Sequence, residues 1–174
     1  AVAAYRSAVA LNAQDQELQV EMVRLMVYSS AGQTTDAQRL ERLREARAAI
    51  EQAIALNPDN SNAHALQAFT LDWLSSLEPG QKDALLTQAS DAAVRALQIN
   101  PANPLAQAFY AEVLADQLKS SQALAVGRQA AELAPDLMDV HRTYGYVLES
   151  DGRYSQAIEE YKKAIAIAPQ LGFL

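Results

Sequence analysis

Apolar and small side chains recur along the chain at the three- and four-residue spacing of amphipathic helices, and short polar breaks separate the helical segments. Residues 138–169 show the pattern most clearly, as two helical segments on either side of Asp151-Gly152-Arg153. The same skeleton reappears 34 residues earlier, with Pro135 in the place of Pro169. A fixed period of this length predicts a solenoid, in which each helix pair buries its apolar face against its neighbours.

The pattern divides a single domain into a half unit and four helix pairs. Asp15 and Ser61 are predicted N-caps, and Thr35 with Gln38 offers a capping box. The predicted units are a half repeat at 1–14 and full repeats at 15–60, 61–103, 104–137 and 138–171, with a truncated tail at 172–174. The pattern therefore predicts about nine helices.

The first two full units are longer than the last two, by 11 and 9 residues over the 34-residue period. In both, the extra residues fall between the two helices of the pair, around residues 30–40 and 75–83. We expect longer helices joined by a longer turn. Since the extra residues occupy the same place in consecutive units, the two extensions should lie side by side on one edge of the array.

Alanine at two fixed positions of every unit supports this register. Counting back twelve and five residues from the closing proline of each full unit, and from Ala13 in the half unit, gives an alanine in every case. Only a methyl-sized side chain permits the closest approach of packed helices, so we expect these alanines to be buried at helix crossings. They are Ala1, Ala46, Ala89, Ala123, Ala157 and Ala8, Ala53, Ala96, Ala130, Ala164.

Residues 138–169 resemble the tetratricopeptide repeat. The resemblance is carried by Tyr144, Gly145, Gly152, Tyr154, Ala157, Tyr161, Ala164 and Pro169. It extends over essentially the whole chain, although Ala13 replaces the first closing proline and Gly127 stands where Tyr161 places a ring. The resemblance implies an all-α, right-handed α-solenoid of stacked antiparallel helix pairs. It also implies a concave face lined by the first helix of each pair.

Composition removes several classes of function. The 174 residues carry a net charge of −7, which argues against a nucleic-acid partner because such partners require clustered lysine and arginine. The chain has no cysteine, so it has neither disulfides nor thiolate metal ligands; this fits the cytoplasm without excluding another compartment. No apolar run approaches the length of a membrane-spanning helix, and no signal-like segment opens the chain. Since a helical pattern is already under way at residue 1, we expect a fragment of a longer array.

No arrangement of residues suggests catalysis. His64 and His141 occupy the same register position two units apart, where a partly buried packing slot is a better explanation than a metal or base site. Glu159 and Glu160 belong to a solvated face. The chain has no glycine-rich phosphate loop and no nucleophile elbow. We therefore expect no enzyme activity, no cofactor and no metal.

The concave face is the expected functional surface. Its exposed inner positions carry seven acidic side chains, two arginines and several aromatic rings. The predicted groove residues are Arg24, Tyr28, Phe69, Trp73, Phe109, Glu112, Asp116, Arg142, Tyr146 and Glu149. Such a surface predicts a non-catalytic scaffold that binds a neutral or basic protein segment, with the aromatic rings as anchors. Two positions of the Trp73 ring stay open: it faces the groove, or it packs under the second extension.

Two other functions remain open at this point. The terminal segments, residues 1–12 and 161–167, lack an outer partner, so the chain could be a structural module that associates end to end. It could also be the accessory repeat domain of a larger enzyme. The first alternative places the sticky surface on the terminal helices, whereas a binding scaffold places it in the groove.

Overall fold

The computed structural model describes residues 2–12 and 14–169, and within them the chain forms nine α-helices. The helices are α1 (Val2–Leu11), α2 (Gln16–Ala31), α3 (Asp36–Leu56), α4 (Ser61–Leu77), α5 (Lys82–Ile99), α6 (Pro104–Asp116), α7 (Ser120–Leu133), α8 (Met138–Ser150) and α9 (Tyr154–Ile167). A short 3₁₀ helix, η1 (Pro79–Gln81), precedes α5. None of the described helices is long and apolar enough to cross a membrane. The truncated tail at 172–174, like Ala1, lies outside the described residues.

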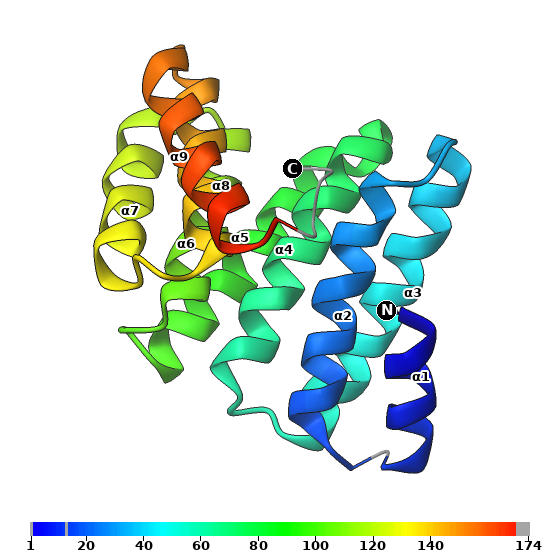
Figure 1. The fold of residues 1–174 in the computed structure, drawn as a ribbon. Helices are drawn as coiled ribbons and strands as arrows, with labels where there is room; N and C mark the ends of the chain where they lie inside the picture. The colour runs from blue at the N-terminus through cyan, green and yellow to red at the C-terminus, as the bar shows by residue number, and fades with distance from the viewer. Residues whose placement is uncertain (1, 13, 170–174) are drawn as a thin grey trace.

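The helices stack as antiparallel pairs, which confirms the predicted all-α array. The pairs are α2 with α3, α4 with α5, α6 with α7, and α8 with α9. Figure 1 shows α1–α3 at one end of the array, α7–α9 at the other, and α4–α6 between them. The first helices of the pairs also pack on one another in sequence, α2 on α4, α4 on α6 and α6 on α8. These four inner helices therefore form one continuous face.

Side-chain caps begin the helices close to the predicted positions. The Asp15 carboxylate accepts a hydrogen bond from the backbone N–H of Leu18 at 3.0 Å, and Thr35 caps α3 through the N–H of Gln38 at 3.2 Å. The predicted Ser61 cap is wrong by one residue. Asn60 caps α4, while the Ser61 hydroxyl donates to the Ala96 carbonyl at 2.9 Å. Asparagine caps as well as serine does, so local sequence alone does not separate two adjacent candidates.

The extra residues of the first two full units mainly lengthen their helices. The inner helices α2 and α4 have 16 and 17 residues, against 13 in α6 and α8. Their partners α3 and α5 have 21 and 18 residues, against 14 in α7 and α9. The two extensions lie side by side, because Ser30, Ala31 and Arg39 of the first line one pocket together with Ser76 and Leu77 of the second.

The repeated alanines lie where the register places them. Among the described members of the set, all but Ala8 are buried, and Ala8 is half-buried. The gap expected at Gly127 is closed by Tyr144 of the next helix, because a Cβ at Gly127 would lie 3.0 Å from Cδ2 of that ring. Gly145 meets the Tyr161 ring in the same way, at 2.8 Å. A glycine on one helix thus accommodates a ring on its neighbour.

The close packing at Ala123 yields the first prediction. Replacing Ala123 with leucine should lower the free energy of unfolding by about 1–3 kcal/mol, because the larger side chain must displace packed neighbours. Urea denaturation would measure the change. Ala125→Leu is a matched control, since Ala125 is exposed on the same helix and should tolerate leucine. Equal stability of the two variants would contradict the assigned register.

Candidate interaction face on the inner helices

The inner helices bring the predicted groove residues together, but they bury half of them. Tyr28, Phe69, Phe109, Glu112 and Arg142 are all buried, so the expectation that these side chains are exposed is wrong. The half-buried members are Arg24, Trp73, Asp116 and Tyr146, and Glu149 is exposed. Each of these residues belongs to one of the inner helices α2, α4, α6 and α8, as the register predicts. The register does not show how closely the inner side chains approach one another across the inner face.

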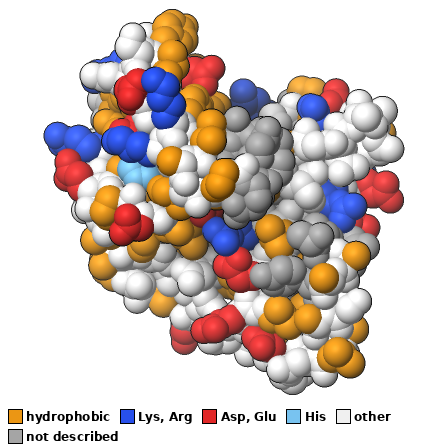
Figure 2. Space-filling model, viewed as in Figure 1, with side chains coloured by type: hydrophobic (Ala, Val, Ile, Leu, Met, Phe, Trp, Pro, Cys, Tyr) orange, Lys and Arg blue, Asp and Glu red, His pale blue; other side chains and the backbone are white. Residues whose placement is uncertain are grey.

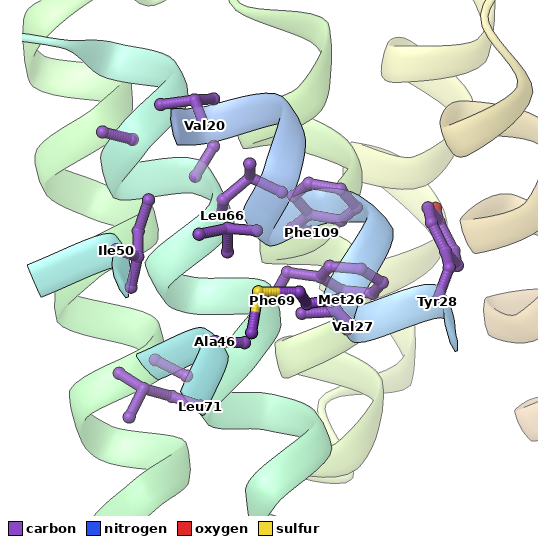
Figure 3. Packing of buried hydrophobic residues seen from close by; sticks show 14 of the residues in the cluster. Val20, Met26, Val27, Tyr28, Ala46, Ile50, Leu66, Phe69, Leu71 and Phe109 are labelled. Carbon is purple, nitrogen blue, oxygen red and sulfur yellow. The ribbon is translucent and has the colours of Figure 1, made fainter. Parts of the chain in front are cut away.

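Aromatic rings from three inner helices form a continuous row. Phe69 of α4 stacks on Phe109 of α6 with centroids 4.2 Å apart and planes 10° apart. Tyr28 of α2 and Trp73 of α4 pack against Phe69 at 5.3 and 5.2 Å. Figure 3 shows Phe69 and Phe109 within the apolar cluster and Tyr28 at its edge. The Trp73 ring belongs to this row and also borders the second extension, so both expected positions of the ring are partly right.

Arg142 of α8 supplies the positive charge at the centre of this row. Its guanidinium bonds both carboxylate oxygens of Glu112 of α6, and Nη1 donates to Oε1 at 3.2 Å. Its Cζ lies 5.0 Å from the centroid of the Phe69 ring and within cation–π range of Tyr28 and Trp73. Burial alone would lower the pKa of Arg142, but the nearby Glu112 and other anionic neighbours outweigh it, and the net pKa is raised. The group therefore stays charged.

A second polar contact joins the first and last full helix pairs across the inner face. Asp139 of α8 is fully buried; it accepts from the Tyr28 hydroxyl at 2.5 Å and from Arg24 Nη1 at 2.7 Å. The backbones of α2 and α8 do not meet among the residues described, so side chains make the connection between these helices. Burial, with the Asp139 charge beside it, raises the pKa of Tyr28 well above its usual value, which keeps the hydroxyl protonated as a donor.

Three carboxyl groups lie together next to the aromatic row. Burial raises the pKa of Asp72 well above its usual value, and the neighbouring Glu112 and Asp116 charges raise it further. Burial, with the Glu112 charge nearby, also raises the pKa of Asp116, whose carboxylate accepts a hydrogen bond from the Tyr146 hydroxyl. The Trp73 indole N–H donates to Glu112 at 3.2 Å. The acidic groups of the predicted groove are thus largely engaged with one another and with the inner helices.

An open polar hollow of about 620 Å³ lies at the beginnings of α2 and α4. Its lining residues are Glu17, Val20, Glu21, Asn57, Asp59, Asn60, Ser61, Asn62, Ile99, Asn100 and Asn103. In the view of Figure 2, acidic side chains gather along the lower edge of the molecule, where Figure 1 places these helix beginnings. The asparagines that line the hollow lie in or next to the repeated Asn-Pro turns, at Asn57-Pro58 and Asn100-Pro101. The hydrophobic pattern did not predict this hollow, although the repeated Asn-Pro turns are visible in the sequence.

The two histidines have a structural role. His64 Nε2 bonds the Pro58 carbonyl oxygen at 2.8 Å, and His141 Nε2 bonds that of Pro135 at 2.8 Å. Gln107 stands in the same register position and donates to the carbonyl of the preceding turn at 3.0 Å. Each side chain therefore satisfies the carbonyl that closes the preceding unit. No group of three or more histidine, cysteine or acidic residues with metal-binding geometry occurs in the described part of the chain.

The carboxyl cluster makes stability depend on pH. Because the pKa of Asp72 is raised on folding, its contribution is complete below about pH 4 and is lost as the pH rises through the folded value. Asp72→Asn cannot titrate, so its free energy of unfolding relative to wild type should rise with pH from about 4 to neutrality. Urea denaturation across that range would measure it.

Glu132→Gln provides the control, because Glu132 is exposed on α7 and does not belong to the cluster. The other charged or titratable groups that act on the cluster are Glu112, Asp116, Arg142, Tyr146 and Lys82. The difference between Glu132→Gln and wild type should not vary with pH. A constant difference between Asp72→Asn and wild type would contradict the raised pKa of Asp72.

Known proteins share this architecture. Two family models, both describing the tetratricopeptide repeat, match residues 138–171 and residues 37–60. Among solved structures, the chain resembles TTC0263, a thermophilic TPR protein in Thermus thermophilus, with a TM-score of 0.74 at 20% identity; the match covers 99% of this chain and 84% of that one. It also resembles MamA 41-end from Desulfovibrio magneticus RS-1, with a TM-score of 0.53 at 12% identity, over 97% of this chain and 84% of that one.

At these identities the solved structures support the fold alone. No curated protein sequence matches the chain. The family models match one helix of a lengthened unit and the whole of a regular one, and the helices pack pairwise as in the solved structures. The chain belongs to the tetratricopeptide repeat family.

Proposed function

We propose that the chain is a non-catalytic interaction scaffold that binds a neutral or basic protein segment on its inner face. Tetratricopeptide repeats generally mediate binding to proteins or peptides. The preference for a neutral or basic segment rests on the open hollow at the beginnings of α2 and α4. Glu17, Glu21 and Asp59 line it, and none of its described lining residues is basic.

The chemistry of the hollow suits an extended chain. Asparagine side chains both donate and accept hydrogen bonds, so they can pair with the backbone groups of a bound segment. The carboxylates favour lysine or arginine side chains in that segment and disfavour acidic ones. From the hollow, the segment would follow the inner face past the half-buried Arg24 and Tyr146 toward the exposed Glu149.

The buried residues of the predicted groove have a different role in this proposal. Phe69, Phe109, Glu112 and Arg142 hold the inner helices together behind the binding surface rather than contacting the partner. A preformed surface loses little conformational entropy on binding. The affinity for the partner therefore comes from the hollow and from Arg24, Tyr146 and Glu149, and the buried network keeps this surface rigid.

Two peptides of equal length and opposite charge would test the proposal. We expect a short unstructured lysine-containing peptide to bind more tightly than a glutamate-containing peptide of the same length, with an affinity that falls as salt rises. The double substitution Glu17→Gln and Glu21→Gln should weaken binding of the lysine peptide roughly threefold to tenfold at low salt. Isothermal titration calorimetry would give both affinities.

Glu132→Gln, on α7 and outside the hollow, is the matched control and should bind like wild type. A preference for the glutamate peptide would contradict the proposal, as would binding that is indifferent to the double replacement.

A specific observation also favours end-to-end self-association. Tyr154, Ile158, Ile165 and Ile167 of the last helix are between 40% and 65% exposed. Leu124 of α7, which corresponds to Ile158 one repeat earlier, is partly buried against a core cluster. An exposed apolar strip promotes association.

Sedimentation velocity at rising concentration would measure this association. We expect oligomers that Ile158→Glu shifts toward the monomer by at least several-fold in dissociation constant, because association would bury the new charge. Glu159→Gln, on the same helix, serves as control. A wild-type chain that stays monomeric would exclude this function.

A further inference from the structure

The two helix extensions enclose a small pocket that is separate from the hollow. The extension pocket has a volume of about 200 Å³ and is lined by Ser30, Ala31, Arg39, Leu43, Trp73, Ser76 and Leu77. This is the room of roughly seven water molecules at about 30 Å³ each, which suits one large side chain. The pocket shares none of its lining with the hollow.

The pocket exists because these two units are longer than the others. In the regular units the inner helix ends after 13 residues, which corresponds to Tyr28 in α2 and Trp73 in α4. Ser30 and Ala31 lie beyond that point in α2, as do Ser76 and Leu77 in α4. Arg39 belongs to the lengthened beginning of α3, whereas Leu43 and Trp73 stand at positions that regular units also have. A repeat of regular length therefore lacks most of the residues that build this site.

The lining combines an apolar surface with one cation. Trp73, Leu43 and Leu77 provide aromatic and aliphatic contact area. Arg39 provides the charge, and its Nε atom is buried without a hydrogen-bond partner among the described residues. Its ion pair, Nη1 to Asp36 at 3.4 Å, is long and exposed, and such pairs contribute little. A buried donor without a partner is unfavourable, so Arg39 would gain from a carboxylate that reached its Nε edge.

The electrostatic setting of the pocket differs from that of the chain as a whole. The chain has a net charge of −7, but α3 carries four arginines and four acidic residues and is locally neutral. An acidic ligand is therefore not repelled at the extension pocket, whereas the carboxylates of the hollow would repel it. The two surfaces select opposite charges.

From these observations we propose that the extension pocket is a second binding site, specific for a partner segment in which a large aliphatic residue adjoins an acidic one. The aliphatic side chain fills the space against Trp73, Leu43 and Leu77. The neighbouring carboxylate accepts hydrogen bonds from the Nε edge of Arg39, after the half-exposed guanidinium turns toward it. The site needs both features, because the apolar wall alone does not distinguish an acid from its amide.

Trp73 is the only tryptophan of the chain, so its emission reports on this pocket. The probes are three short capped peptides that carry leucine–aspartate, leucine–asparagine or alanine–aspartate between serines. We expect the leucine–aspartate peptide to change the emission saturably and to bind about tenfold more tightly than either of the others. Calorimetry on the same peptides gives an independent affinity.

Two variants test the named contacts. Arg39→Gln should weaken the leucine–aspartate peptide about tenfold and leave the leucine–asparagine peptide unchanged. Ala31→Phe should fill the pocket and abolish binding of all three peptides. Arg128→Gln is the matched control, since Arg128 is an exposed arginine on α7 with a similarly weak pair to Glu132. Thermal unfolding of each variant would confirm that the fold is retained.

Three results would overturn the proposal: no saturable binding of the leucine–aspartate peptide, equal binding of its asparagine analogue, or wild-type affinity in Arg39→Gln. The outcome is separable from that for the hollow. Replacing Glu17 and Glu21 with glutamine should not change leucine–aspartate binding, and Arg39→Gln should not change lysine-peptide binding. Failure of one pair of results therefore leaves the other site standing.

Discussion

The Arg142–Glu112 ion pair links all four inner helices. Arg142 extends from α8 to a carboxylate of α6, and its guanidinium also lies close to aromatic rings of α2 and α4. Glu112 in turn accepts a hydrogen bond from Trp73. Removing either charge would leave the other buried and uncompensated, which typically costs about 3–5 kcal/mol. Hydrophobic stacking assembles the helix pairs, whereas this ion pair specifies how the inner helices meet.

This arrangement determines where the molecule can bind a partner. Aromatic rings, the buried Asp72 carboxyl beside Glu112 and Asp116, and the Asp139 contacts occupy the centre of the inner face. Two of the open surfaces, the hollow and the extension pocket, have opposite chemistry. The hollow at the Asn-Pro turns is acidic and rich in amides, while the extension pocket joins an apolar wall to an arginine. A single partner with a basic segment and an acidic–aliphatic segment would satisfy both.

Much of the architecture was predictable because repeats encode it locally. The alanines at fixed positions mark helix crossings, and the Asp15 and Thr35 caps mark where helices begin. The register of His64 and His141 was also visible, although their common acceptor, a proline carbonyl of the preceding turn, was not. The error at Ser61 has the same local origin, because two adjacent residues can both cap a helix.

The sequence by itself determined the helix pairs, their order, the position of the two extensions and the set of residues on the inner face. These properties follow from side-chain size and spacing within one unit and between neighbours. The tertiary structure alone decided which of those residues are buried, and that Tyr28 of the first full pair meets Asp139 of the last. It also decided that the extensions enclose a pocket beside Trp73. The reason is geometric: contacts across several units depend on the accumulated curvature of the whole stack, and no single repeat encodes that curvature.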